Sequence, residues 1–255
     1  MTLKLIYEGK SKLVYELDSD RLIIEFKDDV TAGDGAIRAK APGKDVLCAR
    51  TSAHLFSLLS SSGIDTHMLE FDGNKRMTVK RLNMIPLEVI VRNAAYGSLL
   101  KRMPKFKSLQ LFTTPLVEFH YKDDSLHDPL VLPEDVLYAG VLDEEQLELV
   151  KEVSLKANRV LYDYLSSKGL LLVDIKFEFG FAKDGSIVLA DEISGDTFRV
   201  IDEKGRHLDK EIFRKTRDTR ALIEAYLELA RRLDIRVDDV QALAQQNLRG
   251  LYDAE

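Results

Sequence analysis

Ionisable side chains alternate with large apolar ones along the segment 170–181. Asp174, Lys176 and Glu178 occupy every second position there, with isoleucine and phenylalanine between them. Because successive side chains of a β-strand point to opposite faces, this pattern predicts a strand that presents its charged groups together on one face. Such a face is a candidate for catalysis or ion binding.

Asp184 and Gly185 follow this strand and form a favoured two-residue hairpin turn, which predicts that Glu178 lies directly opposite Asp191. Two carboxylates in that position repel each other unless a cation lies between them. Mg²⁺ binds oxygen ligands, often one or two carboxylates together with substrate phosphates, so these two residues are the predicted metal ligands. The alternative is a solvated polar face that Lys176 neutralises, and a change of one residue in the loop would break the pairing.

Gly9, Lys10, Ser11 and Lys12 form a lysine-bearing turn between two short β-type runs. The turn looks like the end of a P-loop, but Lys4 stands where that motif has its first glycine, and strands flank it on both sides. A turn between antiparallel strands can still fold over phosphates, because glycine permits close approach and the lysines and backbone N–H groups attract anions. The alternative is an ordinary turn whose lysines face solvent.

Arg92 ends a predicted strand, and Ser98 begins the helical run that follows. The N-terminus of a helix has unpaired N–H groups that favour anions, and an arginine can bind the same anion through two hydrogen bonds. The two residues are therefore candidates for binding a phosphate, and the alternative is a helix cap beside a surface ion pair. The glycine-rich stretch 29–35 lacks the third glycine of a dinucleotide fingerprint and is interpreted as a tight turn.

The composition excludes several classes of site and protein. Cys48 is the one cysteine, which excludes a thiolate zinc site and an intramolecular disulfide, and the absence of a G-x-S-x-G motif argues against a serine hydrolase. The 37 basic and 43 acidic residues give 37 − 43 = −6, which disfavours nucleic acid as a partner. The first residues lack an apolar secretory segment and no apolar run is long enough to cross a bilayer, so we expect a cytoplasmic protein without a membrane partner.

The pattern of apolar residues predicts how these candidates are positioned. The first ninety residues are predicted to be mostly sheet with one helix at 45–62. A helix over 143–169 is predicted by a capping pair in its first turn, Asp143 with Gln146, and the C-terminal stretch is predicted to be helical as well. The stretch 103–135 lacks clear periodicity and is predicted to be a long connection of the kind that closes over a site. The mixture predicts an α+β protein of two sheet-containing lobes with a ligand cleft between them.

Two long segments of the sequence read I-P-L-E-V-I-V-R-N-A-A-Y-G-S at 85–98 and L-V-D-I-K-F-E-F-G at 172–180. Together they closely resemble the two signature segments of the SAICAR synthetase family, phosphoribosylaminoimidazole-succinocarboxamide synthase of purine biosynthesis. Four short matches stand in the order expected of that family, at 8–12, 31–35, 127–129 and 191–194. The resemblance extends over roughly residues 4 to 233.

The resemblance implies an ATP-grasp-like fold with ATP between two lobes, which we place at residues 1–83 and 84–255. It implies an ATP-dependent ligase that joins L-aspartate to carboxyaminoimidazole ribonucleotide (CAIR) through an acyl phosphate and releases SAICAR, ADP and phosphate. ATP and Mg²⁺ are the implied co-substrate and metal, and a homodimer is the implied assembly. The alternatives are a kinase of the same broad fold that phosphorylates a small alcohol, and a nucleotide-binding protein without catalysis.

The resemblance also implies roles for individual residues. The loop over the ATP phosphates would comprise Gly9, Lys10, Ser11 and Lys12, and Lys80 and Leu82 would lie in a hinge beside adenine. The catalytic residues would be Lys12, Lys176 and Asp34, and the metal ligands would be Glu178 and Asp191. The substrate contacts would be Arg92, Ser98, His127, Asp128, Asp196 and Arg199.

One position departs from the family pattern. Many members have proline before the aspartate that matches Asp196, whereas this chain has Gly195. Glycine adds backbone freedom, so we expect a looser loop here and a weaker hold of Arg199 on the ribonucleotide phosphate. The resemblance is not extended over the last residues, from about 236 to 255.

Overall fold

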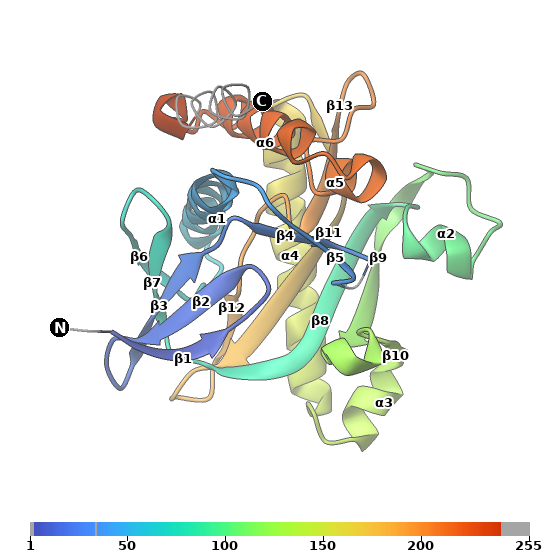
Figure 1. The fold of residues 1–255 in the computed structure, drawn as a ribbon. Coiled ribbons are helices and arrows are strands. Elements are labelled where there is room, and N and C mark those ends of the chain that lie inside the picture. The colour runs from blue at the N-terminus through green and yellow to red at the C-terminus, as the bar shows by residue number, and fades with distance from the viewer. Residues whose placement is uncertain (1–2, 34, 241–255) are drawn as a thin grey trace.

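The computed structural model describes residues 3–33 and 35–240 and contains two large antiparallel sheets (Figure 1). The first sheet has the strand order β1-β2-β3-β7-β6. Its strands are β1 (Lys4–Glu8), β2 (Lys12–Glu16), β3 (Arg21–Phe26), β6 (Met68–Phe71) and β7 (Arg76–Lys80). Helix α1 (Lys44–Ser61) contacts β3, β6 and β7, so it covers one face of this sheet.

The second sheet has the order β10-β9-β8-β11-β12, and β13 pairs with β11 as well. Its strands are β8 (Asn83–Ala94), β9 (Leu111–Tyr121), β10 (Leu130–Val131), β11 (Leu170–Phe181), β12 (Ile187–Ala190) and β13 (Phe198–Asp202). Helix α4 (Glu144–Ser167) contacts β11, β8 and β9 and runs behind them in the view of Figure 1. The predicted α+β class is confirmed.

The remaining elements of the fold are a small β-ribbon and several helices. A two-stranded ribbon, β4 (Asp29–Ala32) with β5 (Ile37–Lys40), precedes α1. The remaining helices are α2 (Ser98–Arg102), the short 3-10 helix η1 (Asp124–Leu126), α3 (Pro133–Tyr138), α5 (Glu211–Thr216) and α6 (Thr219–Arg232). Helix α6 contacts α1 and α5, so the last described helix packs against the first. Within the described residues, no helix is both long enough and apolar enough to cross a membrane.

The predicted capping of α4 is confirmed. The side chain of Asp143 accepts a hydrogen bond from the backbone N–H of Gln146 (2.8 Å), and the Gln146 side chain accepts one from the N–H of Asp143 (3.1 Å). These bonds satisfy two of the donors that every helix N-terminus leaves open. The apolar face of the helix, including Leu161 and Leu165, is fully buried against the second sheet and α1.

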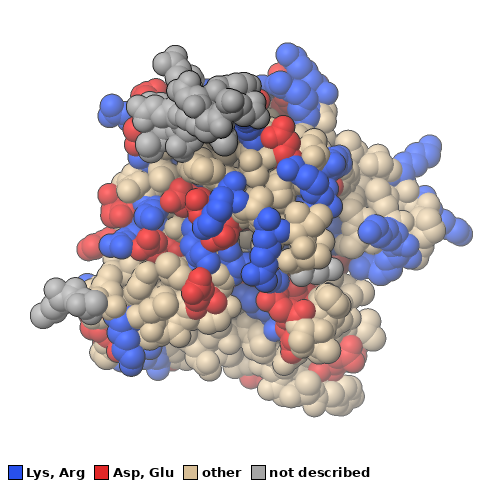
Figure 2. Space-filling view, viewed as in Figure 1, with Lys and Arg blue, Asp and Glu red and all other residues tan. Residues whose placement is uncertain are grey.

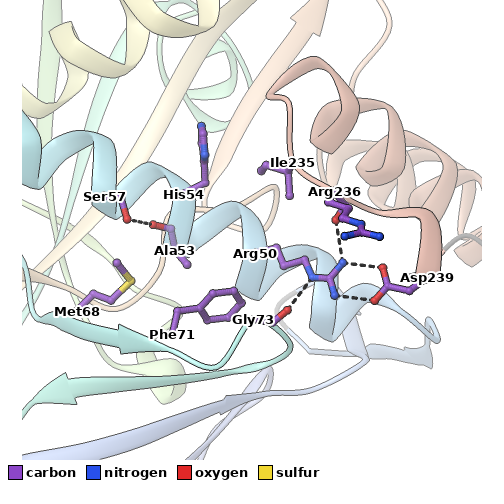
Figure 3. A pocket seen from close by; sticks show the side chains of 10 residues that line it. All are labelled: Arg50, Ala53, His54, Ser57, Met68, Phe71, Gly73, Ile235, Arg236 and Asp239. Carbon is purple, nitrogen blue, oxygen red and sulfur yellow. Dashed lines mark hydrogen bonds and ion pairs between the residues drawn. The ribbon is translucent and has the colours of Figure 1, made fainter.

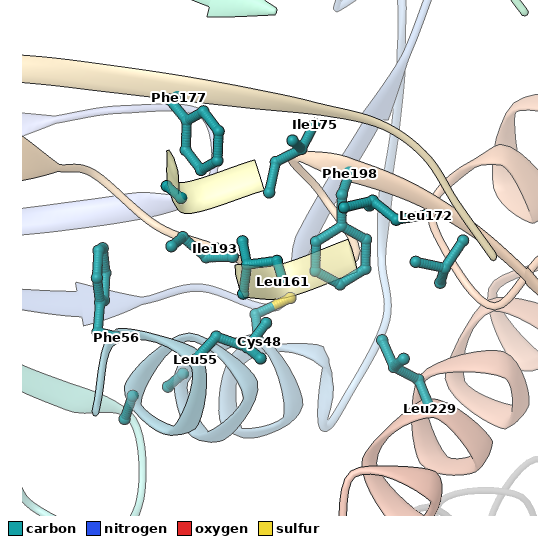
Figure 4. Packing of buried hydrophobic residues seen from close by; sticks show 14 of the residues in the cluster. Cys48, Leu55, Phe56, Leu161, Leu172, Ile175, Phe177, Ile193, Phe198 and Leu229 are labelled. Atoms are coloured by element: carbon teal, nitrogen blue, oxygen red, sulfur yellow. The ribbon is translucent and has the colours of Figure 1, made fainter. Parts of the chain in front are cut away.

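The core forms where the inner face of β11 meets α1 and α6. In Figure 4, Phe177 and Ile175 of β11 lie over Cys48 and Leu55 of α1. All of these side chains are no more than 1% exposed. The apolar half of the alternation in β11 therefore holds the layers together, and its charged half is left for the opposite face.

The stretch 103–135 is not a structureless connection, and that prediction is wrong. It contains β9, β10 and α3. Pro115 lies within β9, where the register on β8 passes from Leu116 opposite Arg92 to Leu111 opposite Ala94. A proline is tolerated at such an irregularity because it has no N–H to donate, and it obscures the strand pattern in the sequence.

Candidate active site

A cleft of about 670 Å³ lies between the two sheets and contains most of the predicted site residues. The β1–β2 turn, the β7–β8 connection, β8, β11 and the segment after β12 all contribute to its walls. In Figure 2, acidic and basic side chains mix near the middle of the face shown. The predicted residues that line the cleft are Gly9, Lys10, Ser11, Lys12, Lys80, Leu82, Asp128, Lys176, Glu178, Asp191 and Asp196.

The lysine-bearing turn faces this cleft, as predicted for a loop over phosphates. The backbone N–H of Gly9 donates to the carbonyl of Lys12 (2.8 Å), which closes the turn. Lys10 pairs with Asp124 of η1 (2.6 Å), and Lys12 pairs with Asp191 and with Glu192 (3.0 Å). The turn thus presents two ammonium groups to the cleft, and acidic groups far along the chain, from Asp124 onward, hold them.

Lys12 and Asp191 stabilise each other's charged forms. Burial opposes ionisation of both groups, but the carboxylates of Asp191 and Glu192 raise the pKa of Lys12 above its ordinary value. Lys12, Lys176 and Lys122 hold the pKa of Asp191 well below its usual range, against the effect of burial. Both groups are therefore charged at neutral pH, as phosphate and metal binding require.

The predicted pairing of Glu178 with Asp191 is wrong by one residue. Glu178 lies opposite Ala190, because the loop has three residues rather than two and the N–H of Ala182 donates to the carbonyl of Ser186 (2.9 Å). Gly185 has φ 84°, as expected for the left-handed position that ends a three-residue hairpin loop. Asp191 follows the end of β12.

Asp191 itself has φ 63°, which is unusual for a residue other than glycine. The left-handed conformation occurs where the chain leaves β12, and it accompanies a side chain that lines the cleft and pairs with Lys12. The neighbouring Glu192 also pairs with Lys12 (3.0 Å). The two predicted carboxylates thus reach one cleft, although they do not form a cross-strand pair.

Glu88 is the carboxylate that lies directly opposite Glu178, on β8. Lys176 bridges the pair, with Nζ 2.8 Å from Oε1 of Glu88 and in contact with Glu178. Lys122, at the end of β9, also contacts Glu178. Glu88 and Lys122 were not predicted, because their positions depend on strand pairing over long sequence distances that no local pattern reveals.

The acidic groups of the cleft fit a magnesium ion bound partly by its substrate. Among residues 3–33 and 35–240 there is no group of three or more histidine, cysteine, aspartate or glutamate side chains placed to hold a metal. Glu178 and Asp191 are two oxygen donors in the same cleft, and the turn of residues 9–12 faces them. Mg²⁺ commonly uses one or two carboxylates and completes its shell with phosphate and water, so the donor set suits it.

Arg92, Ser98 and Arg199 come together, but none of them is among the residues that line the cleft. Arg92 is 1% exposed and donates to Asp174 (2.9 Å), Glu118 (2.9 Å) and Ser98 (3.0 Å). Arg199 donates to both oxygens of Asp174, Oδ2 (2.8 Å) and Oδ1 (3.0 Å), and is 20% exposed. Arg92 is thus neither a surface ion pair nor an exposed phosphate ligand. We call Arg92, Arg199, Asp174 and Glu118 the arginine cluster.

The other predicted contacts occupy different surroundings. Asp128 lines the cleft and accepts a hydrogen bond from the N–H of Asp123 (2.9 Å). His127 precedes it on the exposed surface, with φ 60°, and is not among the residues that line the cleft. Lys80 lines the cleft and pairs with Asp65 (2.7 Å). Asp34 lies outside the described residues.

The loop at Gly195 is not loosened. An added Cβ at Gly195 would lie 2.6 Å from the ring of Tyr226, so the ring occupies the space that any side chain would need. The hydroxyl of Tyr226 donates to Oδ1 of Asp196 (2.6 Å), and Nζ of Lys44 lies 2.7 Å from Oδ2. Glycine is required here by close packing, and the expectation of a mobile loop was wrong.

A second hollow, also about 670 Å³, lies beside α1 (Figure 3). Its charged groups are already paired: Arg50 binds Asp239 with two hydrogen bonds (2.7 and 2.8 Å) and the carbonyls of Gly73 and Arg236. None of the predicted site residues lines it. The cleft between the sheets is therefore the candidate active site.

Comparisons with known proteins agree with this assignment. A family model described as SAICAR synthetase matches residues 5–233. A phosphoribosylaminoimidazole-succinocarboxamide synthase of Caldivirga maquilingensis is 54% identical over 226 residues, which are 89% of this chain and 93% of that protein.

Solved structures agree as well. A structure of SAICAR synthetase (Type-2) in complex with ADP has a TM-score of 0.86 and 46% identity, and the match covers 89% of this chain and 96% of that one. A crystal structure (Type-1) of SAICAR synthetase from Pyrococcus horikoshii has a TM-score of 0.83 and 45% identity, with 88% and 97% covered. The chain therefore belongs to the SAICAR synthetase family of ATP-dependent ligases.

Proposed function

We propose that this protein joins L-aspartate to CAIR, with ATP as the energy source, and forms SAICAR, ADP and phosphate in purine biosynthesis. The observation that carries the proposal is the meeting of Lys12, Lys176, Glu178 and Asp191 in one cleft. A site of this kind combines positive charge for phosphates with acidic groups for a metal. These are the groups that phosphoryl transfer requires.

ATP binds between two lobes, residues 1–83 and 84–255, in an ATP-grasp-like arrangement. The cleft supports this, because both large sheets contribute to its walls. The phosphates lie under the turn of residues 9–12, and adenine lies beside Lys80 and Leu82, which line the same cleft. The relative solved in complex with ADP is consistent with a nucleotide in this place.

The reaction has two steps. An oxygen of the CAIR carboxylate attacks the γ-phosphorus of ATP, the bond to ADP breaks, and an acyl phosphate forms. The amine of L-aspartate then attacks the acyl carbon, releases a proton and expels phosphate. No covalent bond to the protein is needed, so the side chains act by positioning and by stabilising charge.

The cleft residues divide this work. Lys12 stabilises the charge that develops on the transferred phosphate, and Lys176 orients the reacting carboxylate. Glu178 and Asp191 would hold Mg²⁺, whose charge stabilises the phosphate oxygens when it is bound. Asp34 is proposed to be catalytic from the family resemblance.

The arginine cluster serves the ribonucleotide phosphate. Arg199, the partly exposed arginine of the cluster, and the exposed Ser98 beside it bind the phosphate directly. Arg92, which is buried, holds Ser98 and Asp174 in place instead of touching the ligand. His127, Asp128 and Asp196 complete the proposed substrate contacts, and the protein works as a cytoplasmic homodimer.

The test is a coupled assay of ADP release with ATP, CAIR and L-aspartate, each omitted in turn. We expect release only when all three are present. CAIR labelled with ¹⁸O in its carboxylate should transfer one labelled oxygen to the phosphate product, as an acyl phosphate requires. ADP release on a small alcohol without L-aspartate would instead indicate a kinase, and no ATP turnover under any condition would indicate a binding protein.

A further inference from the structure

Three side chains approach the carboxylate of Asp196, one through a hydrogen bond and two as ion pairs. Tyr226 donates to Oδ1 (2.6 Å), and Nζ of Lys44 lies 2.7 Å from Oδ2. Lys44 is 1% exposed, so it is a buried charge that needs this carboxylate. The third side chain, Lys210, has its Nζ 3.6 Å from Oδ2, beyond hydrogen-bond distance.

Lys210 is consequently a cation without a hydrogen-bonded partner in the protein. Its side chain is 14% exposed and lines the cleft, and among the described residues Nζ has no hydrogen-bond acceptor. Burial of an ammonium group without a hydrogen-bond acceptor lowers the stability of the folded protein, unless a ligand or water accepts its hydrogen bonds. Consistent with this, burial lowers the pKa of Lys210 in spite of the attraction of Asp196.

The proposed reaction leaves one set of anionic groups without a partner. The polyphosphate of ATP has the turn of residues 9–12, and the ribonucleotide phosphate has Ser98 and Arg199. The CAIR carboxylate has Lys12 and Lys176 at the point of reaction. The two carboxylates of L-aspartate have no assigned cation. Lys210 lines the same cleft and has no hydrogen-bond acceptor among the described residues, so it matches that need in charge and chemistry.

The position of Lys210 suits an amine nucleophile. Its backbone N–H donates to the carbonyl of Gly195 (2.9 Å), and the carbonyl of Thr197 accepts from the N–H of Lys176 (2.8 Å). Lys210 is thus joined through one short loop to the strand that carries the reactive end of the cleft. An amino acid held by its carboxylate at Lys210 would keep its amine within the cleft, close to the acyl group.

We propose that Lys210 binds a carboxylate of L-aspartate. This inference rests on the proposed function and adds the residue that selects the amine substrate. Gly195 and Tyr226 contribute indirectly, because the ring that fills the space above Gly195 places its hydroxyl on Oδ1 of Asp196, and Lys210 is left 3.6 Å from Oδ2.

The test compares Lys210→Met with Lys210→Arg and with the wild-type protein, using steady-state ADP release. Methionine keeps most of the length of lysine and removes its charge. We expect the KM for L-aspartate to rise by about 10- to 100-fold in Lys210→Met, as for loss of a hydrogen bond between charged groups, and by less in Lys210→Arg. The KM values for ATP and CAIR should change by less than about threefold, because other residues hold those substrates.

Lys204→Met is the matched control, since Lys204 is an exposed lysine on the turn after β13 and does not line the cleft. Lys204→Met should have the kcat and KM values of the wild-type protein. Circular dichroism should show that all three variants are folded. A Lys210→Met protein with an unchanged KM for L-aspartate overturns the inference, as does one in which the KM for CAIR rises instead. The proposed function fails separately, if wild-type ADP release does not require L-aspartate.

Discussion

The lysines that face the cleft and the arginines around Asp174 hold their carboxylates in different ways. Lys12, Lys122 and Lys176, which we call the cleft lysines, contact Asp191, Glu192, Glu178 and Glu88 from flexible side chains at the edge of an open space. In the arginine cluster, Arg92 and Arg199 approach Asp174 from two sides and bury it. One group can exchange partners, and the other cannot do so without disrupting the second sheet.

The difference follows from the chemistry of the two cations. A guanidinium has five donors in a fixed plane and can satisfy several acceptors at once, which suits permanent burial. An ammonium is a compact charge on a flexible stem, so a phosphate that enters the cleft can replace a carboxylate beside it. We infer that the cleft carboxylates keep the lysines in place before ATP binds and are then available to a metal.

In the comparison of the cleft lysines with the arginine cluster, Glu178→Gln should cause the largest loss of activity. It removes a charge from the cleft while keeping the shape of the side chain. We expect kcat to fall by about 1,000-fold, similar to other losses of charge stabilisation in phosphoryl transfer. Glu88→Gln is the matched control, since Glu88 faces Glu178 and shares Lys176 but is not proposed to bind metal. Equal losses in the two variants, measured by ADP release, would contradict the metal assignment.

Arg92→Ala should mainly affect stability, because it leaves Asp174 and Glu118 as buried charges with fewer partners. The free energy of unfolding should fall by about 3–5 kcal/mol in urea titrations. Arg102→Ala provides the comparison, as Arg102 also binds Glu118 but is 38% exposed, and its loss should cost about 1 kcal/mol or less. Similar stabilities of the two variants would show that Arg92 is not the centre of the cluster.

Arg199→Ala should separate substrate binding from stability within the same cluster. Because Arg199 is partly exposed, we expect the KM for CAIR to rise by about tenfold or more while the KM for ATP is unchanged. The measurement is the set of KM values at saturating co-substrates. If both KM values are unchanged, the ribonucleotide phosphate does not bind at this cluster.

The smallest expected effect concerns pH. Burial lowers the pKa of His120, but hydrogen bonds to Glu118 and to the carbonyl of Asp128 outweigh it and raise the pKa above 6.5. A raised pKa stabilises the folded protein below about pH 6.5, and this contribution is lost as the pH rises through the folded-state value. The difference in Tm between wild-type and His120→Gln should therefore narrow above about pH 6.5. A difference independent of pH would contradict this assignment.

The sequence predicts well those elements whose characteristic pattern lies within a short stretch of residues. The alternation in 170–181 predicts β11 with its correct ends, and the capping pair at Asp143 predicts the start of α4. The failures have physical causes. Pro115 hides a strand because it interrupts the pattern at an irregular point of the sheet, and one additional loop residue, Lys183, shifts the register of the hairpin.

The candidate site could be predicted only in part for the same reason. Lys12, Lys176, Glu178 and Asp191 stand in recognisable motifs, and they do line one cleft. Their partners Glu88 and Lys122, and the lysines Lys44 and Lys210 beside Asp196, are brought close by contacts between residues distant in the sequence. Each of them alone looks like an ordinary charged residue. The burial of Arg92 depends in the same way on pairing with both neighbouring strands.

The contact between Gly195 and the ring of Tyr226 constrains how this enzyme can change. A side chain can be accepted at position 195 only after position 226 has become smaller, because a methyl group and the ring would occupy the same space. If a side chain appeared at position 195 first, it would overlap the ring of Tyr226, and α6 could relieve that overlap only by moving outward. The two positions are therefore expected to vary together among descendants of this chain, with the change on the helix occurring first.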